Sequence, residues 1–553
     1  MHQISILRRM CDARADVHWR VLLITLIGCA FLLRVLYCAR IELLPEEAYY
    51  WNYSRHLDIG YLDHPPMVAW LIKLGTLLFG DTEFGVRFGA LGCGTLASYF
   101  IYKLTRNVFG EGSALLALGL AQILPFFFLA GVLMTPDAPL TAAWAASTYF
   151  LERALIAGRR RAWTWAGLSL GLGLLSKYTI AMLGAGTFLF MVLDPASRRW
   201  LRRFEPYAAV GVAAAVFAPV LLWNMEHDWA SFAFQTSRRL AEAPRFSLHR
   251  LVAAALVLLT PTGLLAAGGA LVGTPRGNEP APSVDPVPRA RRFMRIAVFA
   301  PLSVFAIFSL RHDVKLDWTG APWVAALPLM AFGAGPHGTE RIGRWLRPAW
   351  PATLVCLLLF YGAGFYHLVR GIPGLGDTDH TELLPIGWRD FGAQIDGVTD
   401  AVRARYGDEP LVVGMDRYAI ASERAFYSHD RTTAVAETTS WHLFGGMGLM
   451  YERWFPVERE TGRTLLLLAW DPGDLAAVHL GSHVSGLEPL QQGTLARNGR
   501  VVRRYYYRVA HGYRQAPGAG EAALEMLRNA RAAGVSFMGV NSSAPQQRVG
   551  GIG

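Results

Sequence analysis

The sequence predicts a polytopic α-helical membrane protein with about eleven spans and a C-terminal extracytoplasmic α/β or α+β domain. First, 53% hydrophobic against 17% charged residues over 553 positions is too apolar for an ordinary soluble protein of several domains. Second, apolar stretches of roughly 16 to 25 residues recur between positions 20 and 370, and a helix needs roughly 20 residues to cross the hydrocarbon core. Third, beyond residue 376 shorter apolar runs alternate with helical stretches.

Each long apolar stretch predicts one membrane-spanning helix. The predicted spans are 20–38, 84–102, 112–131, 138–156, 162–176, 178–195, 206–223, 250–272, 294–310, 319–335 and 350–369. The fifth and sixth have only Lys177 between them, so two helices or one interrupted helix both fit this region.

The basic residues of the connections predict the orientation. One set of connections is denser in Lys and Arg than the other, and such loops stay in the cytoplasm. This set comprises Arg8, Arg9, Arg14, Arg20, Lys103, Arg106, 159–161, 198–203, 289–295 and 341–347. The N-terminus is therefore expected inside, with no cleaved signal peptide, and the C-terminal part outside the inner membrane. Much of the net charge of +11 lies in these loops, so it does not call for a nucleic-acid partner.

The opposite connections carry acids, bases and aromatic residues, whereas the cytoplasmic ones contain Arg, Gly and Pro with little else. The predicted external segments are 44–70, 134–140, 176–178, 223–239 and 311–323. The cytoplasmic segment 273–292 is typical of a flexible linker. Reactive groups therefore gather on one membrane surface.

This one-sided gathering suits chemistry on a sugar that is linked through phosphate to a polyprenyl chain. The leaving phosphate monoester is a stable anion, which needs neighbouring cations more than a proton donor. The attacking hydroxyl does need a base, and a positioned carboxylate contributes typically about 10²- to 10⁴-fold in rate. A glycosidase would need a pair of carboxylates flanking the bond, which this leaving group makes unnecessary.

Five motifs in one order resemble the bacterial membrane glycosyltransferases of the C type. These are "PEEAYYW", "GYLDHPPMVAWLI", "TPDAPL", "LLSKYT" and "RHDVKLDWTGAPW", all on the predicted external face between residues 45 and 323. The group is related to protein O-mannosyltransferases and to the aminoarabinose transferase that modifies lipid A. "MDRYAIASERAFYS" (415–428) is similar, more weakly, to a strand and helix of these proteins.

The resemblance implies a polyprenyl-phosphate sugar donor, inversion at the anomeric carbon, and a base at the start of an acidic pair in the first loop. Glu46 stands where the family usually has Asp, followed by Glu47, so the carboxylate is kept on a longer side chain. Asp137 matches a second acidic position and could assist or replace Glu46. Lys177, Lys315 and Arg311 match positions that would hold the donor phosphate. The further candidate substrate-binding residues are Asp63, His64, His227 and Tyr50.

Each candidate also has a simpler interpretation. Glu46 and Glu47 could be solvated residues that flank a span. Lys177 could be a lysine that extends toward the interface, and the external aromatic residues could be interfacial anchors. No cofactor is expected to be required. A divalent metal is the alternative, with His64 and Glu47 as weak candidate ligands, although the Asp63-His64 pair before two prolines could only fix a turn.

Three domains are expected. They are a transmembrane catalytic domain over 1–375, an extracytoplasmic domain over 376–515 and a flexible tail over 516–553. In the second, 409–416, 464–471 and 500–510 are predicted strands and 387–406 a predicted helix. Five cysteines all precede this domain, so no disulfide can stabilise it.

The sequence therefore predicts a glycosyltransferase that moves a sugar from polyprenyl phosphate to an acceptor on the external face of the inner membrane. The acceptor could be lipid A, another glycan or a protein. A lipid-linked sugar flippase or transporter is the alternative. Transporters usually contain internal repeats with matching broken helices, and the sequence contains none that we can detect.

Overall fold

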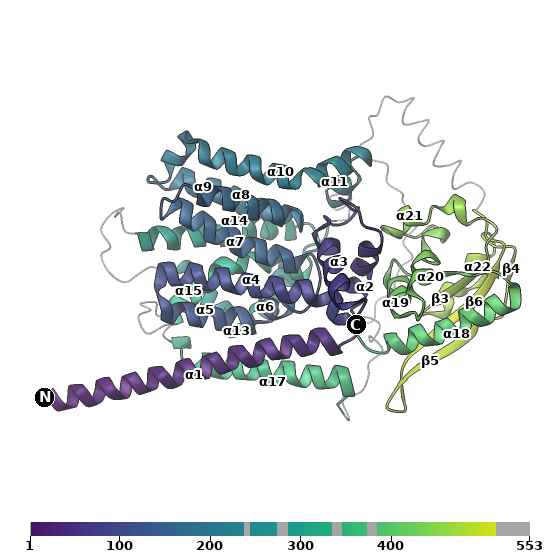
Figure 1. Ribbon diagram of the computed structural model, residues 1–553, viewed down its shortest axis with the longest axis horizontal. Helices are drawn as coiled ribbons and strands as arrows, with labels where there is room; N and C mark the ends of the chain where they lie inside the picture. The colour runs from purple at the N-terminus through teal and green to yellow at the C-terminus, as the bar shows by residue number, and fades with distance from the viewer. Residues whose placement is uncertain (1, 237–243, 274–285, 335–344, 373–383, 516–553) are drawn as a thin grey trace.

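A helical bundle and a smaller sheet-containing part lie end to end in the molecule (Figure 1). This computed structural model describes residues 2–236, 244–273, 286–334, 345–372 and 384–515. Helices α2 (Pro45–Arg55) and α3 (Met67–Phe79) lie between the two parts. The expected 375/376 domain boundary, most of the 273–292 linker and the 516–553 tail lie outside the described residues.

The bundle consists of apolar helices that pack around one large core of Leu, Ala and aromatic side chains. Its helices are α1 (His2–Arg40), α4 (Glu83–Phe109), α5 (Glu111–Ile123), α6 (Pro125–Ala130), α7 (Asp137–Leu155), α8 (Ala162–Leu174), α9 (Ala181–Leu193), α10 (Phe204–Glu226), α13 (Leu248–Val272), α14 (Pro286–Ser309), α15 (Ala326–Ala334) and α17 (Ala349–Arg370). Helical structure is present in every segment that the sequence predicts as a span.

Six of the described helices are long and apolar enough to cross a membrane, which makes the protein a multi-pass membrane protein. They include residues 18–40 of α1 and the whole of α4, α10, α13, α14 and α17. The other predicted spans contain shorter or interrupted helices. Segment 112–131 is divided between α5 and α6 because Leu124 is extended with ψ 141° before Pro125, as expected for a residue that precedes proline. Lys177 is likewise extended, with φ −156°, and separates α8 from α9.

The connections predicted to be external meet at the end of the bundle that faces the sheet. They contain α2, α3, α11 (Ala230–Gln235) and the 3₁₀ turns η1 (Tyr178–Ile180), η3 (Leu316–Thr319) and η4 (Ala321–Ala325). The first of these connections is tied to the end of α8, since the Met67 N–H donates to the Leu175 carbonyl at 3.0 Å. Hydrogen bonds between connections therefore join segments far apart in the sequence.

The smaller part contains a six-stranded mixed sheet with helices on it. Strands β2 (Thr438–Ser440), β1 (Leu411–Gly414) and β3 (Leu465–Ala469) are parallel, and β6 (Arg500–His511) is antiparallel to β3, to β4 (Gly486–Leu487) and to β5 (Gln491–Arg497). The helices are α18 (Trp388–Tyr406), α19 (Ala419–Tyr427), α20 (Arg431–Ala436), α21 (Tyr451–Trp454) and α22 (Ala477–Leu480). Strands β1, β3 and β6 and helix α18 occupy the four segments predicted as strands and helix.

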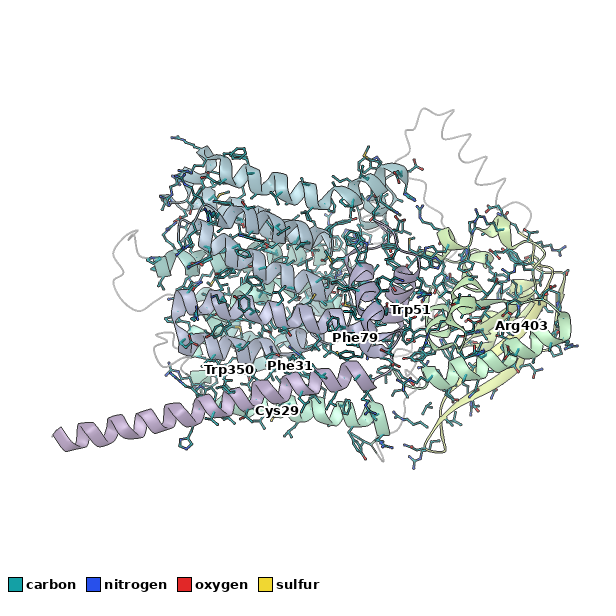
Figure 2. All side chains as sticks on the ribbon, viewed as in Figure 1. Cys29, Phe31, Trp51, Phe79, Trp350 and Arg403 are labelled. Atoms are coloured by element: carbon teal, nitrogen blue, oxygen red, sulfur yellow. The ribbon has the colours of Figure 1, made fainter. Side chains whose placement is uncertain are left out.

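One hydrophobic core contains residues from both parts of the chain. Tyr49, Trp51 and Tyr53 of α2 share it with Phe426 of α19 and Met450 beside α21. The ring centroids of Trp51 and Phe426 are 5.1 Å apart. Figure 2 shows Trp51 at the junction between the bundle and the sheet-containing part. Helix α2 is therefore buried by packing against the C-terminal part.

Candidate active site

Lys177 bridges two carboxylates that come from different connections. Its Nζ lies 2.9 Å from both carboxylate oxygens of Asp137 and 2.7 Å from Oδ2 of Asp317. The side chains of Lys177 and Asp137 are 13% and 14% exposed, and that of Asp317 is 40% exposed. The cluster therefore has one open side, formed by Asp317.

Local backbone structure explains how these three side chains meet. Asp137 is the first residue of α7, after Pro136, and a carboxylate at a helix N-terminus is favoured by the helix dipole. Lys177 lies three residues after the end of α8 and directly before η1, and its N–H donates to the Gly173 carbonyl at 2.8 Å. Asp317 lies in the short turn η3. All three residues thus lie in or beside short connections at the same end of the bundle.

The charges of this cluster act on one another. Burial raises the pKa of the Asp137 carboxyl, while Lys177 opposes that rise and Asp317 adds to it. Burial also acts against ionisation of Asp317, but its contact with Lys177 lowers the pKa of this carboxyl below its usual range. Burial would lower the pKa of Lys177, yet the two carboxylates raise it above the ordinary lysine value. Lys177 therefore stays cationic, and of the two acids Asp137 takes up a proton first.

Glu46 lies beside this cluster on α2. Its side chain is exposed, but the surrounding protein limits its hydration, and this burial raises the pKa of its carboxyl. The positive charges of Lys315 and Lys177 lower that pKa, and Asp317 raises it. Lys315 is exposed in the same connection as Asp317. Glu46 thus combines solvent access with two nearby cations.

Glu47, the next residue, faces the protein interior. Its Oε1 accepts hydrogen bonds from Arg87 Nε and from the Met134 N–H, both at 2.9 Å, and its Oε2 accepts from the Leu44 N–H at 3.1 Å. Its side chain is fully buried, as is that of Arg87. The contacts join the end of α1, α2, α4 and the segment before Asp137. Glu47 therefore lies outside the solvent-accessible group, with both carboxylate oxygens engaged.

Asp63 and His64 lie among the tyrosines of α2. Asp63 is 6% exposed and accepts hydrogen bonds from Tyr49 Oη at 3.2 Å and from Tyr53. Burial raises the pKa of Asp63, and the bond from Tyr53 opposes that rise. The edge of the His64 ring meets the buried Tyr50 ring, with centroids 5.7 Å apart.

His227 and Arg311 have contacts with residues outside the Lys177 cluster. The His227 ring stacks on Trp223 with centroids 4.1 Å apart, and Trp223 Nε1 donates to Asp58 Oδ2 at 2.9 Å. His227 therefore supports the packing of the first connection against the end of α10. Arg311 is exposed, and its carbonyl accepts from the Arg245 N–H at 2.8 Å.

The structure also brings in residues that were missing from the sequence-based prediction. Asp317 lies within the quoted motif "RHDVKLDWTGAPW", two positions after Lys315, but nothing local indicates its contact with Lys177. Tyr418, in "MDRYAIASERAFYS", stacks on Tyr49 with ring centroids 4.7 Å apart. Glu46 and Asp63 both raise the pKa of Tyr418 by their charge, although burial is the larger cause. A residue from the C-terminal part thus lies next to the candidate base.

A metal site was the alternative for His64 and Glu47. Within the described ranges, no three His, Cys, Asp or Glu side chains are grouped so that they could hold a metal ion. The Glu47 carboxylate is bound by Arg87 and by two backbone N–H groups instead. The residues present therefore do not fit a cation at this pair.

Part of the chain is similar in sequence to known proteins. The dolichyl-phosphate-mannose-protein mannosyltransferase family matches residues 63–223. Lipid A galacturonosyltransferase RgtD of Rhizobium johnstonii is 33% identical over 195 residues, which are 33% of this chain and 38% of RgtD. Undecaprenyl phosphate-α-4-amino-4-deoxy-L-arabinose arabinosyl transferase of Pseudomonas aeruginosa is 31% identical over 195 residues, which are 33% of this chain and 35% of that protein. These matches span little more than a third of the length of either relative.

Solved structures resemble the chain over most of its length. The crystal structure of ArnT from Cupriavidus metallidurans in the apo state has a TM-score of 0.56 at 15% identity, and the match covers 89% of this chain and 98% of ArnT. The same protein bound to undecaprenyl phosphate gives a TM-score of 0.54 at 15% identity, covering 88% and 97%. These two structures show that the fold is shared. The resemblance predicted from the motifs is confirmed by the family match and by the two sequence relatives.

Proposed function

We propose that the protein is an inverting glycosyltransferase that moves a sugar from a polyprenyl-phosphate donor to an acceptor at the external face of the inner membrane. The observation that carries this proposal is the exposed Glu46 carboxylate, which lies beside Lys315 and the Lys177 cluster at one end of a membrane-spanning bundle. The relatives named above, whose printed names include transferases of lipid A and of undecaprenyl phosphate sugars, support it.

In the proposed reaction, Glu46 is the base. Its carboxylate takes the proton of the acceptor hydroxyl while the hydroxyl oxygen forms a bond to the anomeric carbon. The bond from that carbon to the phosphate oxygen breaks, and polyprenyl phosphate leaves with the electron pair. Attack opposite the leaving group inverts the anomeric centre. Acceptance of the proton by a positioned carboxylate contributes typically about 10²- to 10⁴-fold in rate.

The two lysines have different proposed roles. Lys315 is exposed, and we assign it to the donor phosphate. Lys177 is paired with both Asp137 and Asp317, so we assign it to holding these two acids and to reducing the negative charge that the donor phosphate meets. Asp137 is less exposed than Glu46, so we assign Asp137 as a positioning residue. Glu46 is the proposed base. Glu47 supports the loop through Arg87.

Asp63, His64 and Tyr50 are proposed to line the acceptor side of the same site. Asp63 is fixed by Tyr49 and Tyr53, and its neighbour Lys315 lowers the pKa of its carboxyl against the larger, opposing influence of burial. His227 and Arg311 are proposed to act outside the site, His227 by packing on Trp223. The acceptor remains one of three classes: lipid A, another glycan or a protein.

We further propose eleven spans, a cytoplasmic N-terminus and an external C-terminal part, with the chain divided as 1–375, 376–515 and 516–553. The density of Lys and Arg in the connections opposite to the site supports this orientation. A reporter that is active only outside the cytoplasm should be active when fused after residue 376 and silent when fused after residue 285. The opposite result would overturn the assignment of sides.

Transfer of a labelled sugar in detergent tests the function directly. Detergent micelles have no second compartment, so a flippase gives no product there, whereas a transferase does. Mass spectrometry of envelope glycolipids and glycoproteins from a deletion strain beside its parent identifies the acceptor class. If no envelope component loses a sugar and no detergent assay gives product, the proposed function is wrong.

A further inference from the structure

A second hollow lies at the end of the bundle opposite to Lys177. The last turn of α4, the C-terminal half of α7 and the start of α8 surround an open space of about 300 Å³. Its polar lining comprises Asn107, Tyr149, Arg153, Arg159 and Arg161.

The length of the helices places this hollow at the other membrane surface. Asp137 begins α7, and Arg153 lies about 24 Å farther along the same helix at 1.5 Å rise per residue. That separation approaches the roughly 30 Å thickness of the hydrocarbon core. Asn107 lies in the last turn of α4, a helix long and apolar enough to span a membrane. The hollow therefore lies at headgroup depth, away from the candidate active site.

Two of its three arginines carry uncompensated charge. The Arg153 guanidinium is bound by Glu152, with Nε to Oε2 at 2.6 Å and Nη2 to Oε1 at 2.8 Å. Arg159 and Arg161 are exposed, and neither forms an ion pair with a carboxylate in the described part of the chain. The hollow thus offers about two positive charges and guanidinium forks, which match phosphate oxygens geometrically.

Aromatic side chains complete the hollow on the lipid side. The rings of Phe150 and Trp165 are nearly parallel, with centroids 6.0 Å apart and an interplanar angle of 24°. Trp165 is 54% exposed, and tryptophan at the membrane interface places its ring at headgroup level. A ligand with a phosphate group and an attached apolar chain satisfies both halves of this lining.

We infer that this hollow binds the phosphodiester headgroup of an anionic phospholipid from the adjacent leaflet. Arg159 and Arg161 contact the phosphate oxygens, Asn107 and Tyr149 supply neutral hydrogen-bonding groups, and Trp165 packs on the start of the acyl chains. The inference is independent of the chemistry proposed for Glu46.

The test measures phosphatidylglycerol retained by the purified protein by native mass spectrometry, with thermal unfolding as a second readout. Arg159→Gln/Arg161→Gln should weaken retention by roughly tenfold or more and remove the lipid-dependent rise in Tm, while Arg159→Lys/Arg161→Lys should keep part of both. The matched control is Arg202→Gln/Arg292→Gln, which removes the same charge from two exposed positions outside the hollow.

Two outcomes would overturn the inference. One is equal phosphatidylglycerol retention by the Arg159→Gln/Arg161→Gln variant and its parent. The other is an equal rise in Tm with inorganic phosphate alone, which would assign the hollow to soluble anions instead of a lipid. Because both arginines are exposed and far from Glu46, transfer in detergent should stay unchanged, so failure of this test leaves the proposed function untouched.

Discussion

Arg87 and Glu47 form a fully buried ion pair that joins the connection between α1 and α4 to α4 itself. Arg87 Nε lies 2.9 Å from Glu47 Oε1, and Arg87 also donates to the Ile41 carbonyl at 2.6 Å and to the Glu42 carbonyl at 2.8 Å. The pair therefore fixes the position from which the preceding residue, Glu46, reaches solvent.

Removing one partner of this pair should destabilise the protein. Glu47→Ala leaves the Arg87 charge buried without its partner, which costs about 3–5 kcal/mol of unfolding free energy. Thermal unfolding in detergent should show a lower midpoint. Glu46→Gln, at the exposed neighbouring position, is the matched control and should unfold near the parent temperature. An unchanged midpoint in Glu47→Ala would show that the pair contributes little.

Glu46→Gln should abolish most of the turnover while the donor still binds. The substitution keeps the size and removes the basic charge, so turnover should fall by about 10² or more. Glu46→Asp should keep more activity than Glu46→Gln because it retains the carboxylate. Both are measured as transfer from a short-chain donor in detergent. If Glu46→Gln is fully active and Asp137→Asn is not, Asp137 is the base; if both are fully active, the mechanism is wrong.

The rate of sugar transfer should fall at acidic pH, with a midpoint above the ordinary pKa of a glutamate side chain. A base acts when deprotonated, and burial raises the pKa of the Glu46 carboxyl above its ordinary value, so activity is present above that raised pKa and is lost as the pH falls through it. Lys315 lowers this pKa, so Lys315→Gln should move the acid limb to still higher pH. Lys103→Gln, at the other end of α4, should leave it in place. If the acid limb of the pH–rate profile stays in place in Lys315→Gln, the titrating group is not Glu46.

Lys177→Ala should affect stability as well as activity. It leaves Asp137 and Asp317 facing each other without their shared cation, so the unfolding midpoint should fall together with the transfer rate. Lys177→Arg should recover stability and part of the rate, since the charge is retained with a different shape. Asp137→Asn combined with Lys177→Met should recover stability without activity. Equal midpoints for parent and Lys177→Ala would contradict the charge-compensating role.

Lys315→Ala should weaken donor binding without loss of stability. Lys315 is exposed, so its removal leaves no buried charge unpaired. KM for the donor should rise severalfold while the unfolding midpoint stays at the parent value. Arg311→Ala, in the same connection, is the matched control and should change KM little. If Arg311→Ala raises the donor KM more than Lys315→Ala does, Arg311 binds the donor phosphate.

The sequence predicted the helical segments of the bundle because apolar composition alone indicates them. It also predicted the three main strands after residue 400, where short apolar runs lie between polar turns. It could not separate Glu46 from Glu47: both are acidic residues at the start of a helix, and their different environments depend on Arg87, which is 40 positions away for Glu47. The contact of Lys177 with Asp317 spans 140 positions and has no local signature.

The surroundings of a single histidine or tyrosine depend on tertiary contacts, which the local sequence does not indicate. His64 before two prolines is compatible with a ligand or a turn, and the sequence does not indicate the contact between its ring and Tyr50. His227 has the composition of a site residue, yet its ring lies flat on Trp223. Tyr418 was overlooked because it comes from a segment more than 350 positions after Glu46, and its proximity depends on how the C-terminal part docks.

The core shared by α2 and the C-terminal part limits which changes in the C-terminal part the bundle can accept. Because Trp51 and Tyr49 pack against Phe426 and Tyr418, a foreign sheet-containing part grafted onto this bundle would leave the first connection without its supporting surface. Changes of acceptor that require a new C-terminal part would therefore need matching changes in the first connection. We therefore expect substitutions in these two segments to depend on one another, although more than three hundred residues separate them in the chain.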